Sequence, residues 1–175
     1  MTDASPRAQD LDRLISKQAL HDLIAIYSRA VDRCDLDLLR SLFWEDAVCQ
    51  YGPRLRAWEW AEATIASLKT RNRTQHFIGN IMVDVDGDEA KGETYVRAYL
   101  EYDSPQGTQE MMIGGRYIDR FERRGGVWKI AFRLYVLDWN QNGPSSAIWN
   151  RDFYARFDVQ GGRAPTDPVY THVRK

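Results

Sequence analysis

Three side chains in the first half of the chain, Tyr27, Asp32 and His76, have the chemistry of an acid–base site. A neutral imidazole, with an unperturbed pKa of about 6.5, is a suitable base at neutral pH. A carboxylate bonded to its other nitrogen fixes the tautomer and stabilises the imidazolium. A tyrosine hydroxyl can stabilise charge that develops on an oxygen. Such a set could remove a proton next to an activating group and expel a β-substituent, with neither a metal nor an organic cofactor.

Asp32 lies within a helical pattern that does not by itself bury it. At about 100° per residue, one apolar stripe is formed by Leu20, Leu23, Ile24, Tyr27, Val31 and Cys34. Asp32 falls roughly 140° from Tyr27 on this wheel, on the side of His21. The helix therefore leaves two interpretations open for Asp32: a solvated charge or the carboxylate of a site.

His76 opens a strand in which alternation places His76, Ile78, Asn80 and Met82 on one face. Two polar residues on an otherwise apolar face need hydrogen-bond partners. A single histidine in this setting is ordinarily a hydrogen-bonded structural residue. The chain has three histidines, and none has a second His, Cys or acidic residue at metal-ligand spacing. We therefore expect no metal site.

A later strand has a second mixed face, on which Arg133 alternates with Tyr135, Leu137 and Trp139. Such a face could line a ligand cavity or contact a partner subunit. The chain contains six Trp, nine Tyr and six Phe. This aromatic content suits a cavity for a flat, apolar ligand and equally suits ordinary core packing.

Helices are predicted before strands along the chain. Pro6, after Ser5, suits a helix start, and Ser16 is expected to cap a second, longer helix over 17–33. A short third helix at 35–43, a short strand at 46–52 and a helix at 58–71 follow. The first part of the chain is therefore predicted to be mainly helical.

From residue 74 the period falls to two, which predicts four strands joined by turns. They cover 76–86, 89–103, 110–124 and 127–139. Within the third of these strands, Gly114-Gly115 predicts a bulge that bends the sheet. The meander is predicted to form an antiparallel sheet with the helices on one face, which is an α+β architecture.

The bulk composition fits one soluble globular domain. The 175 residues are 43% hydrophobic and 28% charged, with a formal net charge of −1. These values do not indicate a basic surface of the kind that binds nucleic acid or an anionic membrane. No run is long enough for a membrane span, and the start does not look like a signal peptide, so we expect a cytoplasmic protein. Cys34 and Cys49 are then expected to be reduced core thiols.

The order of these features resembles the SnoaL-like branch of the nuclear transport factor 2-like superfamily. The shared elements are a helix with Y-x-x-x-x-D, an L-x-x-L-F-x-x-D-A segment, a strand that opens with His, a D-x-D-G-D-x-A hairpin and G-G-R-Y-x-D-x-F-E-R-R-G-G-V-W-K-I. The resemblance covers about residues 10 to 140. It implies a cone-shaped α+β barrel, with a curved sheet around the N-terminal helices, as a domain over 1–142. A tail over 143–175 would pack over the pocket or onto a neighbouring subunit.

The same resemblance implies roles for the site residues. In the family's dehydratases and dehydrochlorinase, an Asp late in the first long helix and a His that opens a strand form a catalytic dyad, which matches Asp32 and His76. Tyr27 matches the dehydratases, whereas the dehydrochlorinase has Lys there. We also expect four residues to bind substrate: Arg133, Asn80, Tyr135 and Trp139.

The predicted function is that of a cofactor-independent lyase or isomerase, dehydratase-like, acting on a small hydrophobic ring compound. Three alternatives stay open: a non-catalytic ligand-binding protein, a structural partner resembling the β-subunit of ring-hydroxylating dioxygenases, and a polyketide-cyclase-type activity. Both faces of the last strands carry large apolar side chains, so one face needs a partner. Together with the resemblance, this predicts a homotrimer, with a dimer as the alternative.

Overall fold

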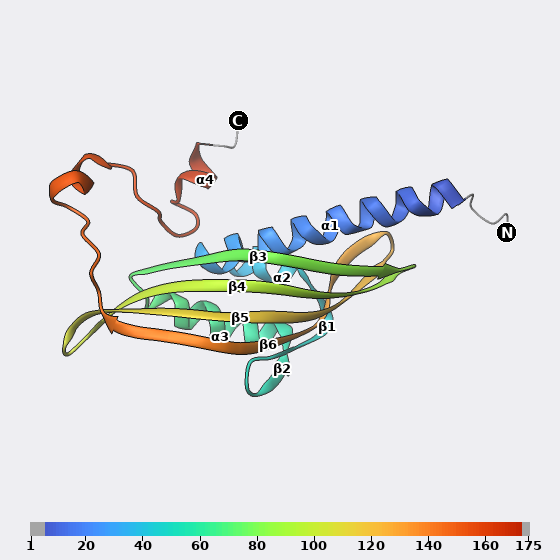
Figure 1. Ribbon diagram of the computed structural model, residues 1–175, viewed down its shortest axis with the longest axis horizontal. Helices are drawn as coiled ribbons and strands as arrows, with labels where there is room; N and C mark the ends of the chain where they lie inside the picture. Colours follow the sequence, from blue (N-terminus) through green and yellow to red (C-terminus); the bar gives the residue numbers. More distant parts are fainter. Residues whose placement is uncertain (1–5, 173–175) are drawn as a thin grey trace.

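The computed structural model describes residues 6–172, which form a single sheet with helices before it, after it and, for one helix, between its second and third strands (Figure 1). The helices are α1 (Pro6–Asp32), α2 (Leu36–Ser41), α3 (Ala57–Lys69), the 3-10 helix η1 (Asp152–Arg156) and α4 (Pro168–Thr171). The strands are β1 (Phe43–Gln50), β2 (Arg54–Arg56), β3 (Arg73–Asp86), β4 (Glu89–Ser104), β5 (Gly107–Arg124) and β6 (Val127–Pro144).

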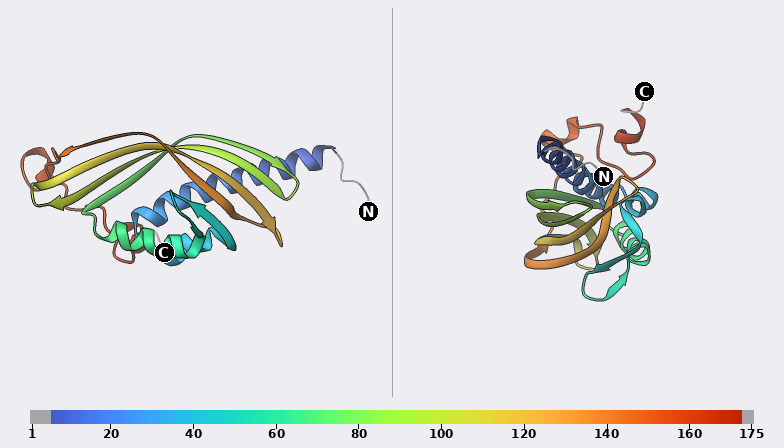
Figure 2. Two further views of the ribbon diagram at one scale, coloured as in Figure 1. Left: turned by 90° about the horizontal axis from the view of Figure 1, so that it is seen from below. Right: turned by 90° about the vertical axis from the view of Figure 1, so that its right-hand side faces the viewer.

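The sheet has the strand order β2-β1-β6-β5-β4-β3. β3 to β6 form the predicted antiparallel meander, whose turns contain glycines at positive φ, such as Gly87 at +59° and Gly107 at +98°. β1 joins β6 in parallel, and β2 and β3 remain at the two edges, so the sheet does not close. Figure 2 shows it arching over α1 and α3. The predicted α+β class and the curved sheet around N-terminal helices are confirmed.

α1 is one continuous helix of 27 residues, so the predicted boundary at Ser16 is wrong. The residues around Ser16 include no proline or glycine that would end the helix, and the Ser16 side chain is buried rather than capping. Its Oγ lies 3.5 Å from Nη1 of Arg123 on β5. The helix starts at Pro6 as predicted; Ser5 lies outside the described residues.

The apolar stripe predicted for α1 is buried, as are Ser28 and Asp32 beside it. The buried face is wider than the helical wheel predicts because α1 packs against the edge strand β3 as well as against β6. Asp32 is only 6% exposed. Its burial thus comes from the edge of the sheet and not from the helix's own periodicity.

The register of the meander shifts at three places. One shift lies between Arg120 and Phe121, and the other two are the bulges described next. The predicted one is confirmed, because the β5–β6 register shifts between Gly114 and Gly115. A second shift, between Ile78 and Ile81 of β3, was not predicted. A bulge inserts a residue and so reverses which face the following residues occupy. Consequently Ile81 is partly buried, while Asn80 is exposed.

After β6 the tail turns back across the molecule towards the C-terminal end of α1 (Figure 1). The backbone N–H of Ala164 donates to the carbonyl of Arg33 at 2.7 Å, and the Tyr170 hydroxyl donates to Asp35 at 2.8 Å. These contacts hold residues 162–170 against the turn that follows α1.

Two further observations bear on the sequence predictions. Cys34 and Cys49 are both free and buried. Among residues 6–172, no helix has the length and apolar character needed to cross a membrane. The cytoplasmic location stays a prediction.

Candidate active site

Asp32 and His76 form a closely bonded pair. Oδ1 of Asp32 lies 2.7 Å from Nδ1 of His76, within the hydrogen-bond distance expected for a dyad. Oδ2 of the same carboxylate accepts the backbone N–H of His76 at 2.8 Å. An ionised carboxylate only accepts hydrogen bonds, so it fixes the imidazole as the Nδ1–H tautomer and leaves the lone pair on Nε2.

The end of α1 aims the Asp32 carboxylate. The helix closes with a Schellman motif, in which the N–H of Asp35 donates to the Ala30 carbonyl at 2.9 Å and that of Cys34 to the Val31 carbonyl at 3.2 Å. Cys34 occupies the left-handed position, with φ +51°. Asp32 is therefore the last helical residue. It faces the first residues of β3, which include His76.

A cavity of about 160 Å³ lies between the helices and the inner face of the sheet, and His76 lines it. The other lining residues are Tyr27, Val31, Tyr51, Trp60, Thr64, Leu68, Val96, Ala98, Leu100, Ile113, Tyr117 and Tyr135. Most of this wall is apolar or aromatic. The polar groups are the imidazole, one threonine and four tyrosine hydroxyls, a composition typical of a small-molecule site.

The tyrosines are neutral hydrogen-bonding groups. The hydroxyls of Tyr27 and Tyr51 lie 2.9 Å apart. Burial raises the pKa of Tyr27 above its ordinary value although nearby Arg133 lowers it, and burial likewise raises the pKa of Tyr51, Tyr117 and Tyr135. Within the described residues the buried Tyr135 hydroxyl has no hydrogen-bond partner. It is an unpaired polar group on a residue that lines the cavity.

Arg133 lies behind the cavity wall and is not among its lining residues. Its Nε and Nη2 donate to the two carboxylate oxygens of Asp119, each at 2.7 Å, and both side chains are fully buried. The guanidinium lies 4.1 Å from the ring centroids of Tyr27 and Tyr117. Burial alone would lower the pKa of Arg133, but the charge and hydrogen bonds of Asp119 raise it well above the usual value. Arg133 thus packs behind Tyr27 and Tyr117 and helps to hold their rings in place.

Asn80 and Trp139 lie in a different place from the one that strand alternation predicts. Both line a hollow of about 540 Å³ on the opposite face of the sheet, with Phe77 and Tyr95. The two bulges explain this correction, since Asn80 lies within the shift in β3 and Trp139 pairs with Gly114 beyond the shift in β6. Of the four predicted substrate-binding residues, only Tyr135 lines the cavity with His76.

Sequence reasoning missed Tyr51, Trp60 and Tyr117 as parts of the site. Tyr51 stacks on Trp60 with ring centroids 4.7 Å apart and on Tyr135 at 5.2 Å. Tyr117 is the register partner of Tyr135, so pairing the last two strands could have identified it. Within residues 6–172 no group of three or more His, Cys, Asp and Glu side chains is placed to hold a metal ion.

Comparison with known proteins assigns this fold and site to a family. A model of the SnoaL-like domain matches residues 12–134, which is most of the chain. The chain therefore belongs to the SnoaL-like family. The matched region contains all the cavity-lining residues up to β5 and ends just before Tyr135.

Similar proteins include enzymes that act on chlorinated rings. Gamma-hexachlorocyclohexane dehydrochlorinase of Sphingobium indicum is 27% identical over 142 residues, covering 71% of this chain and 81% of that protein. The crystal structure of LinA is 28% identical, with a TM-score of 0.68 over 79% of this chain and 95% of that one. A putative scytalone dehydratase from Novosphingobium aromaticivorans, 23% identical, has a TM-score of 0.67 over 77% of this chain and 91% of that one. The last similarity concerns the fold.

Proposed function

We propose that the protein is a lyase that eliminates a group HX from a small hydrophobic ring compound. The observation that carries this proposal is the Asp32–His76 pair, whose second imidazole nitrogen is left for the cavity. Family membership and the dehydrochlorinase relatives support a lyase-type activity in general.

In the proposed step, Nε2 of His76 takes a proton from a ring carbon. The electron pair of the broken C–H bond forms a C=C bond, and the bond to the leaving group X on the neighbouring carbon breaks, with X taking that bond's electron pair. Asp32 holds the imidazole and stabilises the imidazolium that forms. The tyrosine hydroxyls donate to a substrate carbonyl or to a departing oxygen.

The cavity limits the size of the proposed substrate. Its volume is about 160 Å³, and an apolar protein cavity of about 150 Å³ can hold one benzene molecule. We therefore infer a substrate with one six-membered ring in the cavity. Its ring would contact Val96, Leu100 and Ile113, while a polar substituent would face Tyr135.

Turnover of candidate ring compounds tests this proposal. We would incubate the protein with single-ring chlorinated, hydroxylated and keto compounds and detect the unsaturated product by mass spectrometry. His76→Ala should abolish turnover of any compound that the natural chain converts, since a positioned general base contributes about 10² to 10⁴ in rate. His172→Ala, which removes an exposed histidine of the tail, is the matched control.

Three outcomes would count against this proposal. Unchanged turnover in His76→Ala would remove the dyad mechanism. Binding of ring compounds without turnover would favour a ligand-binding protein, and co-purification with an iron–sulfur subunit would favour a β-subunit-like partner.

We also propose that the outer face of the sheet is covered by further copies of the chain, as a homotrimer or else a dimer. Phe77, Met82 and Tyr95 on this face are 68%, 49% and 42% exposed. A group of large apolar side chains on one face marks an interaction surface. Sedimentation at micromolar concentration should give a species of two or three times 20.3 kDa, and a single species near 20.3 kDa would contradict the assembly.

A further inference from the structure

The C-terminal tail provides one side chain, Arg163, that contacts both elements of the dyad. Its Nη1 donates to the backbone carbonyl of Asp32 and, at 2.7 Å, to the hydroxyl of Thr74. Asp32 is the last residue of α1, and Thr74 precedes His76 by two positions on the same face of β3. The guanidinium therefore links the helix end to the strand beside the Asp32–His76 bond.

The other guanidinium nitrogen contacts the end of a second helix. Nη2 of Arg163 lies 3.4 Å from the Leu68 carbonyl and 3.3 Å from the Arg71 carbonyl. The last carbonyls of a helix lack intrahelical partners and carry partial negative charge, so a cation there is favourable. One guanidinium thus closes the ends of α1 and α3 and fixes both to β3.

The carbonyl of Asp32 has a specific need for this partner. The Schellman motif uses the carbonyls of Ala30 and Val31, and the next two, those of Asp32 and Arg33, are not used by it. Both are satisfied by the tail: Arg163 donates to Asp32, and the N–H of Ala164 donates to Arg33 at 2.7 Å. Without the tail, the last turn of α1 would fray, as helix ends do, and the Asp32 carboxylate would move with it.

We propose that Arg163 is a positioning residue that holds the Asp32 carboxylate against His76. This role rests on the proposed function of the dyad and adds to it a residue outside the matched family domain, which ends at residue 134. Arg163 acts through the backbone of Asp32 and does not line the cavity.

Hydrogen exchange of the His76 backbone amide reports this positioning without a substrate. β3 is an edge strand, and this N–H donates to Oδ2 of Asp32, so its protection depends on where the carboxylate lies. Arg163→Ala should raise its exchange rate about tenfold, the loss expected for one charged hydrogen bond. Arg163→Lys keeps the charge but loses the two-nitrogen geometry of the guanidinium, and it should recover part of the protection.

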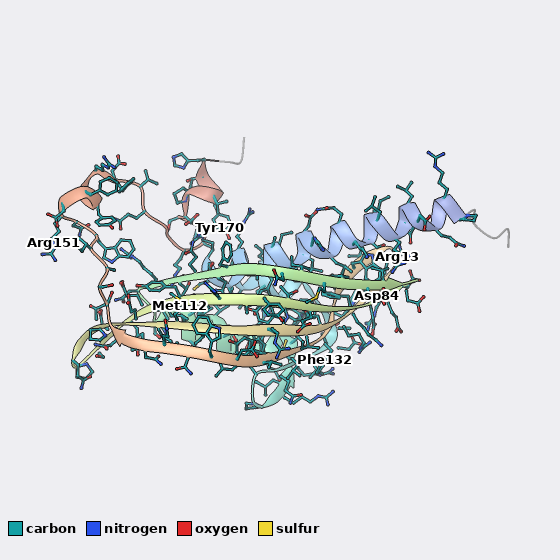
Figure 3. All side chains as sticks on the ribbon, in the orientation of Figure 1. Arg13, Asp84, Met112, Phe132, Arg151 and Tyr170 are labelled. Atoms are coloured by element: carbon teal, nitrogen blue, oxygen red, sulfur yellow. The ribbon has the colours of Figure 1, made fainter. Side chains whose placement is uncertain are left out.

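The controls separate positioning from general loosening of the tail. Arg151→Ala removes another tail arginine, 77% exposed and far from Tyr170 in Figure 3, and should leave the exchange rate unchanged. Thr74→Val removes one acceptor while the tail stays attached, and should raise the rate by a smaller factor. If Arg163→Ala does not fold, Arg163→Lys and Thr74→Val provide the same comparison.

Kinetics completes the test. With a substrate in hand, Arg163→Ala should lower kcat with little change in KM, because Arg163 does not line the cavity. Unchanged His76 amide exchange in folded Arg163→Ala would overturn the positioning role, whatever the protein catalyses. Faster exchange in a chain that converts no ring compound would retain the positioning role and overturn only the proposed function.

Discussion

Two buried acid–base pairs lie under the sheet, and they differ in what surrounds them. The Asp119–Arg133 pair has two bonds of 2.7 Å, and neither side chain is exposed. In the Asp32–His76 pair the side chains are 8% and 13% exposed, and one nitrogen of the imidazole is free of the carboxylate. The first pair can only hold its neighbours in place. In the proposed mechanism the second exchanges a proton with a molecule in the cavity.

One sheet thus holds an enclosed ion pair and a histidine for which we propose a reactive role. Asp119 and Arg133 are register partners on β5 and β6, in the middle of the sheet, so both are enclosed by neighbouring strands. His76 lies on the edge strand, where a helix end can reach it. The position of a pair within the sheet therefore decides whether it is sealed or accessible.

The largest expected effect is a loss of activity when the Asp32–His76 pair is altered. Asp32→Asn should lower kcat by about 10³ to 10⁴, because an amide can no longer stabilise the imidazolium and permits the wrong tautomer. The free energy of unfolding should change little, since the amide still hydrogen-bonds. Kinetics on a substrate identified as above, with urea unfolding in parallel, provides the measurement. Activity within tenfold of the natural chain would show that Asp32 has only a structural role, like Asp119 and Arg133.

The next effect concerns stability. Asp119→Leu leaves a buried guanidinium without its carboxylate and should lower the free energy of unfolding by about 3–5 kcal/mol. The double variant Asp119→Leu/Arg133→Leu removes both charges and should recover most of that loss. Urea denaturation measures both. Equal stability of Asp119→Leu and the natural chain would show that the pair is not a support.

A smaller effect is expected at Tyr135, whose buried hydroxyl has no hydrogen-bond partner among residues 6–172. Tyr135→Phe should raise KM about tenfold by removing one hydrogen bond to the substrate. It should leave the stability of the free protein unchanged or raise it, since an unsatisfied polar group is lost. Tyr154→Phe, on an exposed tyrosine, is the control. A clear loss of stability would mean that the hydroxyl is bonded within the fold.

The smallest effect is a pH dependence at Asp167, whose carboxylate accepts hydrogen bonds from two backbone N–H groups of the tail. Burial raises the pKa of Asp167, but the N–H groups of Gly162 and Val169 and the charge of Arg33 outweigh it and lower the pKa. A lowered folded-state pKa adds stability above the unfolded value, about 3.9, that is lost as pH falls through the folded value. The Gly162 and Val169 amide resonances should therefore titrate together below about pH 4.

Asp167→Asn is the matching variant for this titration. It should abolish the coupled change of the two resonances, because the amide side chain does not titrate. Constant Gly162 and Val169 resonances in the natural chain would show that Asp167 does not anchor the tail.

Local sequence patterns predict the elements of this fold well. The α1 stripe, the four-strand meander and the Gly114-Gly115 bulge follow from periodicity and turn residues, which act over a few positions. The positions of Asn80 and Trp139 do not, because one inserted residue in β3 and one in β6 reverse their faces. The choice of Asp32 as a candidate site residue required the family resemblance, since its burial depends on a strand more than 40 positions away.

The contribution of Arg163 could not be predicted from the sequence. The segment around it has no periodicity, and its contacts join residues separated by 131 and 89 positions. Such contacts are set by where the tail lies on the folded domain and not by any local preference.

The two bulges have a consequence for the shape of the cavity. Ile78, Val96, Gly115 and Leu137 are successive register partners, so they form one row across β3 to β6, and both register shifts begin at this row. Bulges bend the strands that contain them, and Figure 2 shows the strands bending midway along their length. The row is a crease along which the sheet folds over, with Val96 of the crease facing the enclosed space. The volume of the cavity therefore depends on residues within the strands, so exchanging the hairpin tips should leave the cavity intact. A side chain on Gly115, whose Cβ would lie 2.3 Å from the Val136 carbonyl, should force the crease to open.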